Sequence, residues 1–315
     1  MTSNDRAGGR PLLLAVLGAA SISASGIMIT LADTGVVTAA FVRCFLAVPL
    51  LVLLAVLEQR RRGPRPLAAR AGAFVAGLFL AVDLVLWNHA IAEVGAGIAT
   101  VLGNLQVLFV VFVAWAVFGE RPGRRFLIFL PVVMAGVVMV SGLVGRADGG
   151  THPLAGIGYG VATSIAYSGF LLILRRTSSG GPHVAGPLAE ATAGATVGAA
   201  LIGLVFGGLQ LHIPWPSFGW LLLLSLTSQT IGWLLITSSL PRLPAAISSL
   251  TLLLQPAAAM LLAAIVLNER PTPVQIVGAV VVCCGVLAVS LAASPPEPVG
   301  EPEEELEPAT TGSLA

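Results

Sequence analysis

Four polar side chains stand near the middle of long apolar stretches of the chain. Asp83, Gln106, Gln229 and Gln255 each lie about halfway along such a stretch, measured at about 1.5 Å per helical residue. An unpaired polar group is costly in lipid, so these side chains need partners or a water-filled cavity. We interpret their common depth as a binding site for a small substrate. The alternative is that they hydrogen-bond neighbouring helices together, a role Gln commonly has in membranes.

Asp83 has the most distinctive chemistry of the four. Trp87 follows it by one helical turn on the same face, and a ring beside a carboxylate can hold a cationic or amphipathic substrate. A carboxylate shielded from water is also suited to carry a coupling proton. The alternative is a structural ion pair with Arg43. Arg43 itself could bind a substrate carboxylate through a bidentate contact or serve only as this counter-charge.

Two further residues extend the candidate site. Trp233 follows Gln229 by one turn and repeats the Asp83 and Trp87 arrangement, although it could equally face lipid. Asn104 lies toward the external half of its apolar stretch. We therefore predict that Trp233 and Asn104 bind substrate or take part in coupling, as Arg43 and Asp83 do.

The elements that position these residues are membrane helices. Of 315 residues, 56% are hydrophobic and 10% are charged, against roughly 25% charged in soluble domains, so lipid must cover the fold. The sequence predicts an all-α integral membrane protein with ten transmembrane helices, each long enough to cross the hydrocarbon core. The spans are expected at residues 11–31, 36–57, 71–92, 96–118, 125–145, 154–174, 184–208, 217–239, 244–267 and 273–293.

The distribution of Arg indicates the orientation. Of the 16 basic residues, all of them Arg, thirteen lie on the side that both termini share, two on the other side, and Arg43 within a span. The positive-inside rule therefore predicts cytoplasmic termini in a multi-pass protein of the plasma membrane. Residues 1–10 form the cytoplasmic N-terminus, and residues 295–315 form a disordered acidic tail that is either merely solvated or binds a partner.

The chain repeats itself with an offset of 149 residues. Residues 96–141 and 245–290 share 15 identities in 46 positions, and the Gln at 106 and 255 and the Glu-Arg-Pro turns at 120–122 and 269–271 coincide. Residues 11–148 and 154–294 are thus predicted to be two repeats of five spans. Because five is odd, the second repeat must be inverted in the membrane. Inverted repeats with a site between them are typical of secondary transporters.

The stretches 86–141 and 231–291 resemble the paired modules of the drug/metabolite transporter superfamily, specifically its ten-span EamA-type branch. The resemblance rests on Pro256 in mid-helix, the acidic turn at Glu269 and the Gly-containing helix that follows; the first copy departs from it at Val107, where the second has Pro256. It covers about residues 11–294. It implies a ten-helix bundle that moves small metabolites, amino acids or drugs, often outward.

We therefore predict a secondary transporter that moves a small metabolite, amino acid or drug-like solute by alternating access, with proton-coupled efflux as one form. The alternatives are a facilitator or channel without coupling and, less favoured, a membrane-embedded enzyme. The sequence contains no His-Glu-x-x-His or Walker motif, so no catalytic residue, metal or cofactor is expected.

The expected partners are a small-molecule substrate, membrane lipid and a coupling proton. Nucleic acid is not expected, because there is no basic stripe. The choice between monomer and dimer stays open. The G-x-x-x-G pair formed by Gly194 and Gly198 is expected to pack helices within one protomer.

Overall fold

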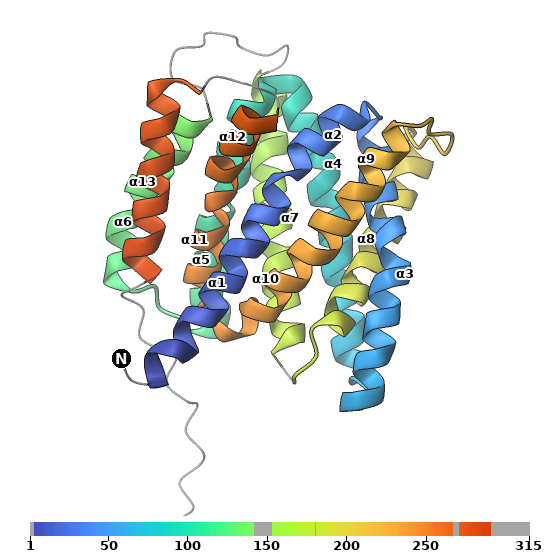
Figure 1. Ribbon diagram of the computed structural model, residues 1–315, viewed down its shortest axis with the longest axis horizontal. Helices are drawn as coiled ribbons and strands as arrows, with labels where there is room; N and C mark the ends of the chain where they lie inside the picture. Colours follow the sequence, from blue (N-terminus) through green and yellow to red (C-terminus); the bar gives the residue numbers. More distant parts are fainter. Residues whose placement is uncertain (1–2, 142–152, 180, 267–270, 291–315) are drawn as a thin grey trace, which may run out of the picture.

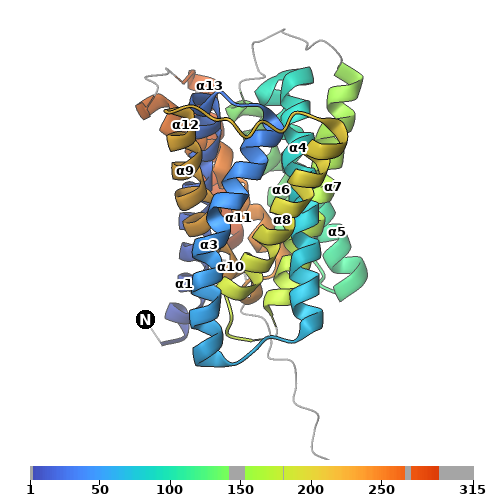
Figure 2. The same ribbon diagram turned by 90° about the vertical axis from the view of Figure 1, so that its right-hand side faces the viewer.

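A computed structural model describes residues 3–141, 153–179, 181–266 and 271–290. Every regular element in these ranges is helical (Figures 1 and 2). The elements are α1 (Ser3–Ser23), α2 (Ser25–Ala32), α3 (Val36–Arg62), α4 (Leu67–Asn104), α5 (Gln106–Phe118), α6 (Arg124–Val140), α7 (Pro153–Ser178), α8 (Ala185–Phe206), α9 (Ser217–Leu224), η1 (Ser225–Gly232), α10 (Trp233–Ser239), η2 (Leu240–Arg242), α11 (Ala245–Leu252), α12 (Leu254–Val266) and α13 (Pro273–Ser290).

Eight helical segments of the described residues are long and apolar enough to cross a membrane. They correspond to the expected spans except the fifth and the tenth. Those two spans coincide with α6, of 17 residues, and α13, of 18 residues, which are apolar but shorter. The chain is therefore a multi-pass membrane protein built from helices, and α6 and α13 pack against each other at one side of the bundle (Figure 1).

Helices from the two halves of the chain pair in a repeating pattern. In chain order, α1, α3, α4, α5 and α6 correspond to α7, α8, the α9–α10 segment, the α11–α12 segment and α13. The contact of α4 with α7 is matched by that of α1 with η1 and α10, and the contact of α5 with α7 by that of α1 with α11 and α12. Three further contacts, α3 with α8, α5 with α11 and α6 with α13, join corresponding helices. These contacts are the ones expected if the two halves are repeats of each other.

Glycines allow the closest of these helix contacts. A Cβ on Gly77 of α4 would lie 1.8 Å from the carbonyl oxygen of Ala191, and one on Gly194 of α8 would lie 2.1 Å from that of Phe74. Gly198 packs against Ala81 of α4 in the same way. The G-x-x-x-G pair of α8 thus contacts a helix of the same chain, as small residues at membrane helix interfaces do.

Two spans are interrupted at matching positions. The fourth span breaks at Leu105, between α4 and α5, and the ninth breaks at Leu253, between α11 and α12, which agrees to within one residue with the 149-residue offset of the repeat. Pro256 lies in the first turn of α12, where a missing N–H is tolerated. The first break has Val107 at the corresponding position, so the break does not require proline. Broken helices at membrane depth are a device of transporters, because they expose backbone groups to a cavity.

Two other spans depart from regular α-helix. The eighth contains η1, a π-helical segment with Gln229 within it, and such segments are frequent at functional sites. The sequence predicts a turn near residues 92–96, but this segment is helical and belongs to α4. The chain nevertheless reverses direction within α4. Trp87 shows the reversal, because its Cδ1 would lie 3.7 Å from a Cβ on Gly103 of the same helix.

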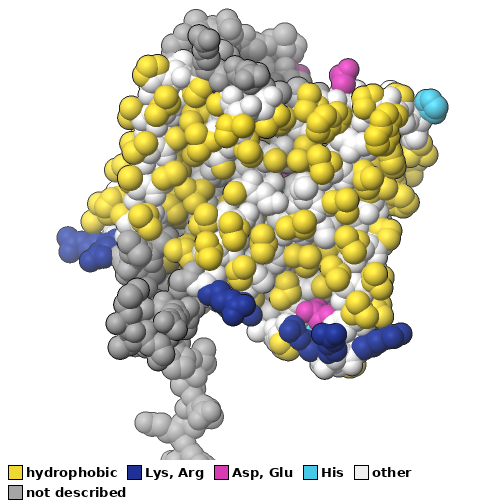
Figure 3. Space-filling model, in the orientation of Figure 1, with side chains coloured by type: hydrophobic (Ala, Val, Ile, Leu, Met, Phe, Trp, Pro, Cys, Tyr) yellow, Lys and Arg dark blue, Asp and Glu magenta, His cyan; other side chains and the backbone are white. Residues whose placement is uncertain are grey.

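Polar contacts tie the loops together at the end of the bundle where the basic residues gather, which we call the arginine end. It comprises the described loops and helix termini around residues 58–70, 119–125, 175–186 and 240–245. Glu120 accepts a hydrogen bond from Arg175 and another, of 3.1 Å, from the main-chain N–H of Ala245 at the start of α11. Glu120 is thus part of a helix-end structure, as its turn sequence indicates, whereas Glu269 lies outside the described residues. In Figure 3 the visible Arg side chains lie toward this end.

Substitution of Gly194 by Ala should destabilise the fold. The added methyl group would overlap the main chain of α4 at Phe74, and such overpacking typically costs about 1–3 kcal/mol. Thermal unfolding of the purified protein in detergent measures the effect. Gly158→Ala is the matched control, because no atom lies within 4 Å of a Cβ at that position of α7. Equal melting temperatures of the two variants would contradict the close packing of α4 and α8.

Candidate functional site

The buried guanidinium of Arg43 is at the centre of the candidate site. Arg43 lies in α3 and is 5% exposed, and its Nη2 donates a hydrogen bond of 3.0 Å to Oε1 of Gln229 in η1. Gln229 in turn donates from Nε2 to Oγ1 of Thr192 in α8, at 3.3 Å. The Nε of Arg43 is buried without a hydrogen-bond partner. A charged donor that is buried and incompletely bonded is unfavourable for folding, so it marks this point as a candidate binding group for an acceptor.

Asp83 of α4 lies within electrostatic range of Arg43, although the two do not form a direct ion pair. The four ion pairs closer than 4.0 Å among the described residues all lie at the arginine end. Asp83 is 8% exposed, and its main-chain carbonyl accepts a hydrogen bond of 3.5 Å from Thr163 of α7. Its carboxylate is thus held by charge at a distance rather than by a direct bond to Arg43.

Tyr167 of α7 completes the cluster. Its ring lies within electrostatic range of both Asp83 and Arg43, and its hydroxyl is beside the side-chain amide of Gln255 in α12. The Nε2 of Gln255 is buried without a geometrically complete hydrogen bond. Five elements of the bundle, α3, α4, α7, η1 and α12, therefore bring Arg43, Asp83, Tyr167, Gln229 and Gln255 together.

Gln106 occupies a different position, at the first break. It is 1% exposed and donates a hydrogen bond of 3.4 Å to the carbonyl of Ser249 in α11, while its Oε1 is buried without a partner. Ser168 of α7 donates to the main-chain carbonyl of Gln106 at 3.1 Å. Ser164 of α7 donates to the carbonyls of Leu102 and Gly103. Gln106 thus joins α5 to α11, and the hydroxyls of α7 satisfy carbonyls at the break.

The two tryptophans have different surroundings. Trp233 is 2% exposed and packs edge-on against Phe170, with 4.8 Å between ring centroids, and against Tyr167, at 6.3 Å. It therefore lies within the bundle rather than toward lipid. Trp87 lies beside Gly103 near the end of α4, and Asn104 is the last residue of that helix. The structure thus brings Trp233 to Tyr167 and the cluster, and Trp87 to the neighbourhood of the first break.

Tyr167 belongs to the cluster and Thr192 contacts it, but neither is among the site residues predicted from the sequence. Tyr167 carries a signal that could have identified it, because it is one of only two Tyr in the chain and stands in the middle of the sixth span. Thr192 carries no comparable signal, since Thr and Ser recur throughout the spans. Chemically, the assembled cluster offers a cation, a carboxylate, a phenol and two amides in a largely dehydrated setting. Among the described residues, no three His, Cys, Asp or Glu side chains are grouped to hold a metal ion.

Loss of the Gln229 side-chain amide should destabilise the protein through Arg43. Gln229→Leu keeps a similar volume but removes the acceptor of the guanidinium, and hydrogen bonds to charged groups contribute about 1.5–3 kcal/mol. We expect chemical denaturation in detergent to show a loss of this size. Gln229→Glu, which restores an acceptor and adds a counter-charge, should recover most of it. Full stability of Gln229→Leu would mean that Arg43 does not depend on this contact.

The chain was compared with known proteins. The model of the EamA-like transporter family matches residues 9–142 and again residues 154–291. A solved structure described as "Crystal structure of protein" has a TM-score of 0.74, with 16% sequence identity over 90% of this chain and 99% of that chain, which shows a shared fold. No match was found among curated proteins. Because the two family matches together span most of the sequence, the chain belongs to the EamA-like transporter family.

Proposed function

We propose that the protein is a secondary transporter that binds a small solute at the cluster formed by Arg43, Asp83, Tyr167, Gln229 and Gln255. The observation that carries this proposal is the incomplete bonding of the cluster. Arg43 and Gln255 each retain a buried nitrogen without a partner, and the carboxylate of Asp83 is not paired directly with Arg43. A purely structural network would be expected to satisfy its members, because half-satisfied polar groups in a membrane interior destabilise it.

The substrate of such a site is a small metabolite, amino acid or drug-like solute with at least one polar group. Arg43 would bind an acceptor such as a carboxylate, and Asp83 would bind a cationic group or carry a coupling proton. Gln229 orients the guanidinium, and Tyr167 and Trp233 supply one aromatic wall. Asn104, Gln106 and Trp87 would act at the first break, where the path from one side of the membrane passes.

The architecture we propose is a bundle of ten membrane helices arranged as two inverted repeats of five. The breaks at Leu105 and Leu253 and the corresponding helix contacts of the two halves both support it. Two near-equivalent halves can exchange inward-open and outward-open states around one site, which is alternating access. In the present conformation Arg43, Asp83 and Gln229 are buried, with no more than 8% of their surface exposed, whereas Tyr167 and Gln255 are partly exposed.

We further propose that the arginine end faces the cytoplasm and that the protein resides in the plasma membrane. Thirteen of 16 Arg lie on this side, whereas Arg146 and Arg270, the two assigned to the other side, lie outside the described residues. The positive-inside rule relates this bias to orientation. A facilitator without coupling remains the second candidate, because it needs the same site but no proton carrier.

Cysteine labelling should establish the orientation. In a background without the three native Cys, Arg61→Cys at the arginine end should be protected from an impermeant thiol reagent in intact cells. His212→Cys, an exposed position between α8 and α9 at the opposite end, should be labelled. Reagent access to Arg61→Cys without permeabilisation would reverse the proposed topology.

Transport itself is tested in proteoliposomes with a panel of amino acids, nucleosides and cationic drugs, with and without a pH gradient. Accumulation of one solute only under the gradient would indicate proton coupling, and equilibration without it would indicate the facilitator. No movement of any solute class above that of empty liposomes would contradict the proposal. Once a substrate is found, the same vesicles serve to test individual residues.

Asp83→Asn should keep the folded protein and abolish concentrative transport. The substitution preserves shape and removes charge, and no direct ion pair with Arg43 is lost. The measurements are the yield of monodisperse protein in detergent and the gradient-driven rate. Loss of folded protein before any transport defect would instead assign Asp83 a structural role as counter-charge of Arg43. Normal yield with a normal rate would exclude both roles.

A further inference from the structure

A groove opens on the side of the bundle at the arginine end, away from the cluster. It has a volume of about 350 Å³ and is lined mainly by residues of α3, α4 and α8, three helices that lie beside one another in Figure 2. Its lining consists of Val52, Ala55, Val56, Gln59, Arg65, Arg70, Phe74, His183, Gly186, Ala189, Glu190 and Ala193. None of these residues belongs to the candidate transport site. The groove therefore needs an occupant of its own.

The lining changes from polar to apolar along the groove. On α3 and α4 the polar residues Gln59 and Arg70 lie nearer the arginine end than Val52 and Phe74, and on α8 Glu190 lies nearer that end than Ala193. Gln59 and Val52 lie about 10 Å apart along α3, at about 1.5 Å per residue. Val52 is 44% exposed, so the groove is open to lipid at this depth. A lateral groove with a polar outer part and an apolar inner part matches an amphiphile rather than a soluble ion.

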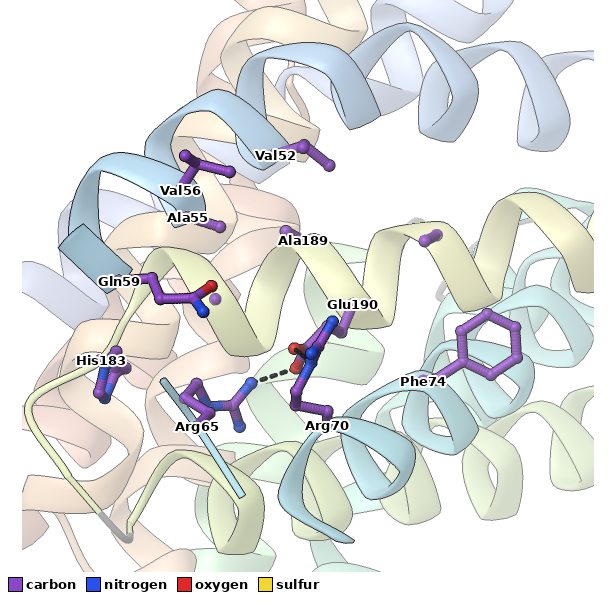
Figure 4. Close-up of a pocket in the computed structure, with 12 residues that line it drawn as sticks. Val52, Ala55, Val56, Gln59, Arg65, Arg70, Phe74, His183, Ala189 and Glu190 are labelled. Atoms are coloured by element: carbon purple, nitrogen blue, oxygen red, sulfur yellow. Dashed lines mark hydrogen bonds and ion pairs between the residues drawn. The ribbon is translucent and has the colours of Figure 1, made fainter. Parts of the chain in front are cut away.

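Charge favours an anionic headgroup. Arg65 and Arg70 flank Glu190 (Figure 4), and Arg70 bonds it at 2.9 Å while its side chain stays 54% exposed. The adjoining end of α3 adds Arg60, Arg61 and Arg62. Glu58 partly offsets them, but its carboxylate already accepts hydrogen bonds from the main-chain N–H groups of Val184 and Gly186. Two Arg and one Glu line the groove, and Arg60, Arg61 and Arg62 at the adjoining end of α3 outnumber Glu58, with which Arg62 is paired, so the excess charge near the groove is positive.

We propose that this groove binds one anionic phospholipid from the membrane leaflet at the arginine end. The phosphate lies against Arg70 and the neighbouring Arg side chains, and an acyl chain runs inward along Val52, Phe74 and Ala193. Glu190 holds Arg65 and Arg70 at the groove and lowers the affinity for an anion through its own charge. The proposal rests on the membrane location of the bundle and does not depend on which solute is transported.

Lipid binding is measured by native mass spectrometry of the delipidated full chain, with phosphatidylglycerol and phosphatidylcholine of equal acyl chains. We expect tighter binding of phosphatidylglycerol, weakened about fivefold by Arg70→Gln, since one Arg near an anionic surface contributes about 1 kcal/mol. Arg121→Gln, an exposed Arg at the same end but outside the groove, is the matched control and should have little effect. Glu190→Gln should tighten binding.

The apolar half of the groove is tested separately. Ala193→Phe should fill the inner part and weaken phosphatidylglycerol, whereas Val197→Phe on the exposed face of α8 should not. Equal binding of the two lipids, or equal effects of Arg70→Gln and Arg121→Gln, would overturn the proposal. So would competition by inorganic phosphate at concentrations comparable to the lipid, because the groove would then hold a soluble anion.

Discussion

The buried guanidinium of Arg43 restricts how the surrounding helices can be placed in the membrane bundle. Arg43 cannot lose its charge, so an acceptor must be brought to it, and the acceptor is Gln229 of η1. That bond fixes the position of the eighth span relative to α3, and Thr192 extends the constraint to α8. The π-helical winding of η1 places Gln229 in the buried part of the bundle. The cluster therefore exists because a cation has been placed where water cannot solvate it.

The small residues of the bundle make that placement possible. Gly77 and Gly194 allow α4 and α8 to approach until backbone meets backbone, and this contact lies on the same two helices that carry Asp83 and Thr192. Packing in a membrane gains no hydrophobic driving force between helices, so close contact supplies much of the stability. The close packing and the polar contacts consequently involve the same two helices, α4 and α8. A substitution that loosens the packing therefore also disturbs the polar contacts, and the reverse holds as well.

Much of this arrangement could be predicted from sequence, for physical reasons. Length and hydropathy give the spans, because lipid tolerates few polar groups, and the coincidence of Gln106 with Gln255 indicates the repeat. The bonding within the site could not be predicted. Sequence patterns give the depth of a side chain but not the direction in which it points, so they leave open whether Arg43 binds a substrate or pairs with Asp83, and they do not indicate its bond to Gln229, which lies 186 residues away. For the same reason the sequence does not decide whether Trp233 faces lipid or the bundle interior, and it does not indicate Thr192 as a site residue.

The serines of α7 have a consequence for the ease of movement. The hydroxyls of Ser164 and Ser168 each lie within hydrogen-bond distance of a carbonyl one turn back in α7, at 3.1 and 2.6 Å, and of a carbonyl across the interface, so the single hydrogen of each can go to either acceptor. If α7 slides away from the break at Leu105, each hydroxyl keeps its bond within the helix, so separation strands no donor. The interface between α7 and the broken span can therefore separate without leaving either serine hydroxyl unbonded. The amide of Gln229, by contrast, has no such alternative within its own helix among the described contacts, so separating η1 from α3 would leave the guanidinium of Arg43 without this acceptor.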